Sequence, residues 1–150
     1  MLSGEIHDIN PTVDRTNGFM ATSQKNGLTP IVQVMPSDAT VNFRKMLIHQ
    51  AITEQQPDGI MATDDTTALL VLEALRTMNL RVPQDVQVVG YDGSAFILQS
   101  FPELSTVVQP IADLAKTLVE ALLTKIDQPE RLQERQYMFP VTFHRGTTTK

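Results

Sequence analysis

The stretch GIMATDDTTALLVLEAL, residues 59–75, passes from a short apolar run to a long one through two adjacent acids, Asp64 and Asp65. The first run has the length of one buried strand. The second continues to Met78 and is apolar almost all round, which is typical of a helix covered on several sides. A buried strand followed directly by a buried helix is the repeating unit of a parallel α/β sheet.

The same alternation extends in both directions from this stretch. Strands are predicted in residues 2–6, 31–34, 59–62 and 86–91, and helices between about residue 12 and Gly27 and over 41–55, 65–78 and 111–126. A long irregular loop is expected between Asp92 and Pro110. A last strand in residues 136–145 is expected at an edge, because Pro140 cannot donate to a ladder. The predicted fold class is therefore α/β, with a mostly parallel, doubly wound sheet.

Composition narrows the class of protein. The chain has 150 residues, a net charge of −5 and no cysteine, with 41% hydrophobic and 19% charged residues. This suits one folded domain. The absence of cysteine excludes disulfides and thiol nucleophiles, and the acidic balance argues against nucleic-acid binding by this chain alone. The first ten residues lack the pattern of a signal peptide, and no apolar run is long enough to span a membrane, so a cytoplasmic location is expected.

Distinctive charges fall after the predicted strands. Arg15 follows the first strand, Asp64 and Asp65 follow the third, and Asp92 follows the fourth. In open parallel sheets, ligands bind beyond the carboxyl ends of the strands. For Asp64, Asp92 and Arg15 we favour ligand contact. For Asp65 the alternative is equally open, because Asp65 or Thr66 could simply cap the helix that follows.

Sequence motifs of several kinds of functional site are absent from the chain. There is no phosphate-binding G-x-x-x-x-G-K-[ST] or G-x-G-x-x-G sequence, and the three histidines show no metal spacing. The three aspartates could supply oxygen ligands to Mg²⁺, as in a phosphotransfer enzyme, which stays open as an alternative. One arginine among carboxylates suits a neutral polyol better, because carboxylates accept from hydroxyls and guanidinium donates to them. No metal or cofactor is predicted.

Several stretches resemble the C-terminal core of the LacI/GalR family of bacterial transcription regulators. These are PDGIMATDDTTALLVLEALRTMNLRVPQDVQVVGYDGS (57–94), RTNGF (15–19), ELSTVVQP (103–110) and FPVTFHRGTT (139–148). The resemblance implies a periplasmic-binding-protein-like fold with an effector between two subdomains. It also implies effector-binding roles for Arg15, Asp64, Asp92 and Gln109. Asp65 corresponds to the aspartate that follows Asp64 in the family pattern, as a helix cap or a residue behind the binding residues.

Two positions depart from the family pattern. Asp64 stands where the family usually has asparagine, and Gly93 stands where a second acid is common. An added carboxylate raises the cost of binding an anion, because unpaired like charges repel. The sequence therefore favours a neutral sugar over a sugar phosphate, whereas the loss at Gly93 puts one further contact in doubt.

The resemblance also implies a division of the chain. Residues 1–109 correspond to the C-terminal subdomain, 110–128 to a crossover helix belonging to the other subdomain, and 129–150 to a return strand and tail. The family's helix-turn-helix has no counterpart here, so operator DNA would be bound only through a segment absent from this chain. A fragment or a truncated product is expected.

The function implied is that of the sugar-binding and dimerisation part of a LacI-type repressor, which makes and breaks no bond. A periplasmic-type sugar carrier and the Mg²⁺-dependent enzyme remain alternatives. The resemblance implies a homodimer contact through Leu69 and Leu72. The apolar stripe of the helix over 111–126 is expected to be repacked on the chain's own body, covered by a second chain, or left disordered, because its exposure would forgo roughly 1.5–3 kcal/mol per large side chain.

Overall fold

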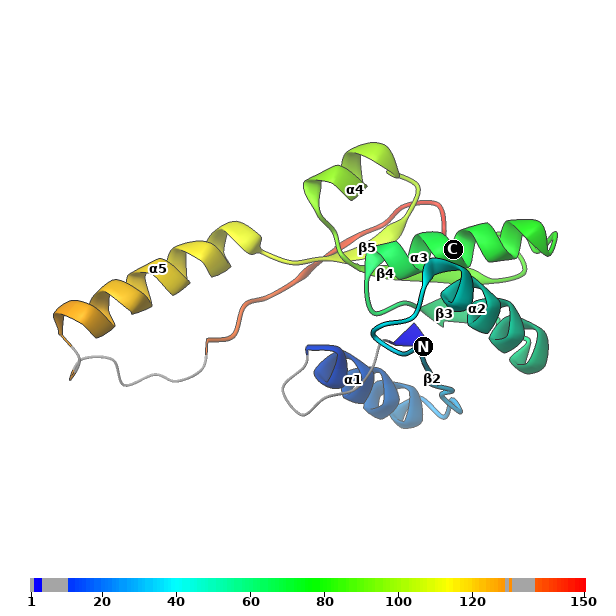
Figure 1. The fold of residues 1–150 in the computed structure, drawn as a ribbon, viewed down its shortest axis with the longest axis horizontal. Helices are drawn as coiled ribbons and strands as arrows, with labels where there is room; N and C mark the ends of the chain where they lie inside the picture. Colours follow the sequence, from blue (N-terminus) through cyan, green and yellow to red (C-terminus); the bar gives the residue numbers. More distant parts are fainter. Residues whose placement is uncertain (1, 4–10, 129, 131–136) are drawn as a thin grey trace.

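The computed structural model describes residues 2–3, 11–128, 130 and 137–150. Helices and strands alternate along most of this part of the chain (Figure 1). They are β1 (Leu2–Ser3), α1 (Pro11–Lys25), β2 (Gln33–Val34), α2 (Val41–Gln55), β3 (Gly59–Met61), α3 (Asp65–Thr77), β4 (Gln87–Asp92), α4 (Ala95–Ser100), β5 (Ser105–Val108), α5 (Ile111–Asp127) and β6 (Thr142–His144). The remainder of the strand predicted over residues 2–6 lies outside the described residues.

The main sheet has the order β3-β4-β5-β6. The first three strands are parallel, with Ile60 opposite Val88 and Gly90 opposite Thr106, and β6 runs antiparallel to β5. β1 and β2 form a separate parallel pair. The predicted α/β class with a mostly parallel sheet is confirmed, and the last strand lies at an edge as expected.

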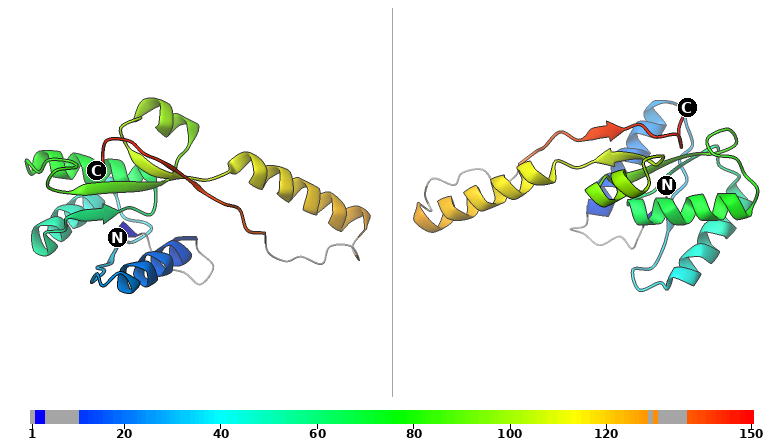
Figure 2. Two further views of the ribbon diagram at one scale, coloured as in Figure 1. Left: turned by 180° about the vertical axis from the view of Figure 1, so that it is seen from behind. Right: turned by 90° about the horizontal axis from the view of Figure 1, so that it is seen from above.

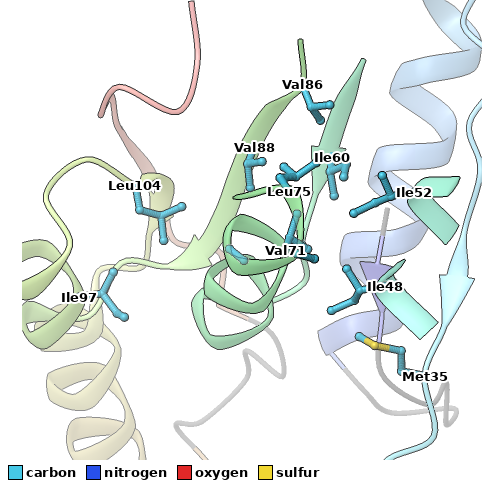
Figure 3. Packing of buried hydrophobic residues seen from close by; sticks show 13 residues of the cluster. Met35, Ile48, Ile52, Ile60, Val71, Leu75, Val86, Val88, Ile97 and Leu104 are labelled. Atoms are coloured by element: carbon cyan, nitrogen blue, oxygen red, sulfur yellow. The ribbon is translucent and has the colours of Figure 1, made fainter. Parts of the chain in front are cut away.

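The hydrophobic core lies where α2 and α3 pack beside β3 and β4 (Figure 3). One side of α3 is fully covered, through Ala68, Val71, Ala74 and Leu75. These positions repeat at helical spacing, so the same residues that suggested a helix also bury it. The helix begins where the Asp64 side chain accepts a hydrogen bond from the backbone N–H of Thr67. The core thus fixes the position of the first turn of α3.

The segment between Asp92 and Pro110 differs from the prediction. It was expected to be an irregular loop, and it contains α4 and β5. β5 starts with two fully buried hydroxyl residues, Ser105 and Thr106, which weaken the apolar pattern of a buried strand. Their hydroxyls are hydrogen-bonded to the side chains of Thr149 and Asp65, so they are buried at little cost.

Helix α5 extends away from the sheet, and the chain then returns to add β6 (Figures 1 and 2). No residue of α5 is buried. Its exposed large apolar residues are Ile111, Leu118, Val119, Leu122, Leu123 and Ile126. The helix is formed as predicted, but its apolar stripe is not packed on any other part of the chain that the structure describes. Among the described residues, no helix is long and apolar enough to cross a membrane.

Candidate functional site

The carboxyl ends of three parallel strands meet at one edge of the main sheet. β3 leads into Asp64, β4 ends at Asp92, and β5 is followed directly by Gln109. Hydrogen bonds and one ion pair connect the side chains at this edge, as the next paragraphs describe. The structure therefore brings together the residues that the sequence singled out.

Arg15 reaches this edge from the first turns of α1. Its Nη2 lies 3.3 Å from Asp92 Oδ1, and its Nη1 donates to the carbonyl of Thr63 at 2.5 Å. The guanidinium carbon lies 3.9 Å from the centroid of the Tyr91 ring, a cation–π contact. Only 16% of the Arg15 side chain is exposed. Because Arg15 is held on three sides, its remaining N–H groups have a fixed direction.

Asp92 is the more open partner, with 41% of its side chain exposed. Its Oδ1 accepts from Gln109 Nε2 at 2.7 Å, and its backbone carbonyl accepts from the Gln109 N–H at 3.1 Å. Partial burial raises the pKa of Asp92, and the nearby Arg15 charge and the Gln109 hydrogen bond oppose that rise. The result is a carboxylate that is paired on one oxygen and accessible from outside.

Asp64 is the N-cap of α3. Its Oδ1 accepts from the Thr67 N–H at 2.7 Å, and its Oδ2 accepts from the Thr67 hydroxyl at 2.9 Å. The alternative that Asp65 or Thr66 caps this helix is wrong, because the helix already starts at Asp65, one or two residues earlier than those caps require. Asp64 remains half-buried, so capping leaves part of this carboxylate at the surface.

Asp65 points inward and is 3% exposed. Its Oδ1 accepts from the Thr106 hydroxyl at 2.5 Å and its Oδ2 from the Gly93 N–H at 2.8 Å. Burial raises the pKa of Asp65, the two hydrogen bonds lower it, and the neighbouring charges of Asp92 and Asp64 raise it further. Asp65 therefore lies behind the site, in contact with the residues that support it.

Sequence reasoning missed three groups at this edge. Tyr91 supports Arg15 with its ring, Thr63 accepts from Arg15 through its backbone carbonyl, and Thr106 donates to Asp65. Tyr91 could have been found, because it immediately precedes Asp92 at the end of a strand. The other two carried no signal, since a backbone acceptor has no side-chain signature and Thr106 lies in the strand that was interpreted as a loop.

The aspartates do not converge as a metal site would require. Both oxygens of Asp64 and both of Asp65 accept hydrogen bonds from neighbouring groups of the protein. Within the described residues, no group of three or more His, Asp or Glu side chains could hold a metal ion. What the edge offers is a set of oriented donors and acceptors, the chemistry that recognises hydroxyl groups.

The two residues predicted at a dimer contact lie on α3. Leu69 and Leu72 are half-buried and pack partly against the core. Beside them, Glu73 of α3 forms a 2.7 Å ion pair with Lys45 of α2, and the adjacent Met46 is 52% exposed. α2 and α3 therefore form one connected surface that carries apolar side chains.

Comparisons with known proteins agree with this fold. The model of the family described as periplasmic binding protein-like domain matches residues 2–149. The sucrose operon repressor of Pediococcus pentosaceus is 38% identical over 99% of this chain and 45% of its own length. The ribose operon repressor of Escherichia coli (strain K12) is 30% identical over 93% of this chain and 43% of its own length. The chain thus spans a little under half the length of these relatives.

A solved structure shows the same likeness in three dimensions. It is the lac repressor dimer bound to operator and the anti-inducer ONPF, which is 26% identical with a TM-score of 0.83. The match covers 99% of this chain and 51% of that one. The whole of the described fold therefore has a counterpart in about half of that repressor chain.

Proposed function

This chain belongs to the periplasmic binding protein-like domain family, in the form found in LacI-type regulators, and we propose that its carboxyl-end site binds a neutral sugar. The observation that carries the proposal is the network of Arg15, Asp92 and Gln109. It places a charged donor, a charged acceptor and an amide side by side at the edge where parallel sheets bind ligands. Hydroxyl groups both donate and accept, so a polyol matches this mixture.

Charge favours an uncharged ligand. Arg15 is already paired with Asp92, and Asp64 adds a half-buried carboxylate close by. A phosphate group brought to this edge would meet two carboxylates and only one cation, so repulsion would offset most of its attraction to Arg15. The relatives named for sucrose and ribose operons make these two sugars the natural first probes.

The magnesium enzyme is a weaker candidate, because the oxygens of Asp64 and Asp65 are engaged in hydrogen bonds that hold the local fold. The carrier alternative has less support, since the relatives named above are repressors. In our proposal the chain makes and breaks no bond. Its sugar acts by differential binding to two conformations of a longer regulator in the cytoplasm.

The ligand class can be tested by amide chemical-shift mapping of the chain at millimolar ligand concentration. We expect sucrose or ribose to shift the amide signals of Gly93 and Gln109. Gly93 follows the proposed contact residue Asp92, and the Gln109 N–H donates to the Asp92 carbonyl. Glucose 6-phosphate and Mg²⁺ should leave both in place. A larger response to the phosphate ester, or to Mg²⁺, would contradict a neutral-sugar site.

The second part of the proposal concerns the division of the chain. Residues 1–109 would form one subdomain, α5 within 110–128 would pack on a second subdomain, and 129–150 would return to the first. Support comes from α5, which is formed but has no buried residue, and from the length of the relatives. Binding of operator DNA would belong to a further segment, which the relatives' greater length has room for.

The third part is a homodimer through α3. Leu69→Lys places a charge beside its own copy at a two-fold contact, so it should separate the protomers. The long stem of lysine can keep covering the core, so the fold should survive. Because α5 is also apolar, the test belongs in a chain carrying Leu118→Lys and Leu122→Lys.

Sedimentation should show a dimer in that background and a monomer once Leu69→Lys is added. Arg76→Ala, an exposed change on the same helix, is the matched control and should leave the dimer intact. A Leu69→Lys chain that still sediments as a dimer would exclude this surface as the contact.

A further inference from the structure

The turn that carries Asp92 has an uncommon backbone conformation. Asp92 has φ 116° and Gly93 has φ 59°. Both values lie on the positive side of φ, which residues with a side chain rarely adopt. A side chain added to Gly93 would also collide with Val108, its nearest atom lying only 2.6 Å away. Such a turn persists only where its surroundings hold it.

Two hydrogen bonds hold this turn. From the residue after β5, the backbone N–H of Gln109 donates to the carbonyl of Asp92 at 3.1 Å. From α3, Asp65 Oδ2 accepts from the Gly93 N–H at 2.8 Å. The second bond comes from a residue 28 positions away in sequence, so it ties the turn to a helix of the core rather than to its own loop.

Asp65 is itself fixed. Its other oxygen accepts from Thr106, which is 0% exposed, and Gly90 leaves it room because a Cβ at that position would collide with Asp65 Oδ1. Strands β4 and β5 and the turn at Gly93 therefore determine where its carboxylate lies. A buried carboxylate is costly unless it is fully hydrogen-bonded, and here each oxygen has one buried donor.

We propose that Asp65 is a positioning residue for the sugar site, acting through the Gly93 N–H to hold the turn in the conformation that presents Asp92 beside Arg15. Asp65 does not touch the ligand in this arrangement. The proposal rests on the proposed function for its sugar readout, but the turn itself can be tested without a ligand.

The hydrogen bond should be visible in amide exchange of the ligand-free chain. In Asp65→Ala the Gly93 amide should exchange at least about tenfold faster, because its charged acceptor is gone. The Val88 amide, which donates to the Thr148 carbonyl at 2.9 Å, is the internal reference for global stability. Asp65→Asn keeps one oxygen acceptor and should restore most of the protection. Asp113→Ala, at an exposed aspartate in the first turn of α5, should change neither amide.

The second readout is affinity for sucrose and ribose in the same variants. Asp65→Ala should lower the affinity for the sugar by about tenfold or more. Asp65→Asn should recover most of that affinity, because it again offers an acceptor to the Gly93 N–H. Equal acceleration at Gly93 and Val88 would show a merely structural role and overturn the proposal. So would a freed Gly93 amide with unchanged affinity.

The two proposals fail in different ways. A parent chain that binds no neutral sugar refutes the proposed function, whereas a Gly93 amide that stays protected in Asp65→Ala refutes the positioning role. If Gly93 is freed selectively in a chain that binds no sugar, Asp65 holds the turn but has no sugar site to serve, and that result also overturns the inference.

Discussion

The polar edge of the sheet and helix α5 differ in whether their side chains have partners within the described part of this chain. At the edge, Arg15, Asp65 and Asp92 each find their partners within this chain. On α5, six large apolar residues are more than half exposed, and none of the helix is buried. The polar side chains of the first region are paired with one another, whereas the second presents a surface that the described residues leave uncovered.

The contrast shows which properties belong to the chain alone. Hydrogen bonds and one ion pair across the edge connect the region of α1, α3, β4 and β5, so contacts among the described residues fix the geometry of these side chains. An isolated helix of the length of α5 is marginal in water, and most helix stability comes from a packed apolar face. The role of α5 therefore depends on what covers it.

Matched leucine truncations in the core and on α5 should show the largest difference in the free energy of unfolding. Leu75 is 0% exposed and lies in the core, whereas Leu118 is 69% exposed on α5. Leu75→Ala should lower the free energy of unfolding by about 2–5 kcal/mol through lost contacts and a cavity. Leu118→Ala should change it by less than about 0.5 kcal/mol, as at other exposed positions.

Urea unfolding of both leucine variants at one protein concentration measures the difference. A comparable loss in Leu118→Ala would mean that α5 is covered in solution, by the body of the chain or by a second chain, which would remove the contrast drawn above.

A pair of glycine substitutions sharpens the comparison at the edge. Gly93→Ala should cost roughly 1–3 kcal/mol, because the residue has a positive φ and its new methyl would meet Val108. Gly18 lies inside α1 with open space where a Cβ would be, so Gly18→Ala should stabilise the chain by about 0.5–1 kcal/mol. Thermal unfolding of both variants gives the comparison, and a neutral Gly93→Ala would show that the turn is loose.

The smallest expected effect is a dependence of stability on pH. Burial raises the pKa of Asp65 in the folded state, so the folded chain binds that proton more tightly than the unfolded one. Its contribution to stability is therefore greatest below the ordinary pKa of aspartate, and it is lost as the pH rises through the raised value. In Asp65→Asn this titration is absent.

The stability of Asp65→Asn relative to the parent should accordingly increase as the pH rises through that window, and then level off. Denaturant unfolding of both chains from pH 3.5 to 7 follows the difference, in which the titration of groups that do not interact with Asp65 cancels. A difference that runs the other way would mean that the hydrogen bonds to Thr106 and Gly93 outweigh burial.

The sequence was sufficient for features that depend on strong local patterns. The apolar run after Asp65 predicted a buried helix, and the strand ends predicted that Asp64 and Asp92 would share one edge. These predictions rest on periodicity and on a topological rule, which need no knowledge of side-chain contacts. The family resemblance pointed to the same aspartates and was the source of Gln109, because the strand before Gln109 was not predicted.

Features that depend on long-range contacts could not be predicted. The strand at Ser105 and Thr106 was missed because two polar residues lie where apolar ones are expected, and their partners are about 40 residues away. One local feature was also missed: Asp65 or Thr66 was considered as the helix cap and Asp64 was not, since adjacent acids look alike until their directions are known. Only the structure shows that the Asp64 carboxylate lies partly at the surface and the Asp65 carboxylate is buried.

The most direct test of the proposed neutral-sugar site is a calorimetric titration of sucrose and ribose into the parent, Arg15→Ala and Arg81→Ala. Arg81 pairs with Asp85 in the turn that precedes β4, so its loss is the matched control for a lost guanidinium. We expect Arg15→Ala to weaken the binding free energy of the sugar by about 1–3 kcal/mol, the cost of a lost charged hydrogen bond. We expect Arg81→Ala to bind the sugar like the parent. Equal affinity in the parent and Arg15→Ala would place the sugar elsewhere and contradict the account.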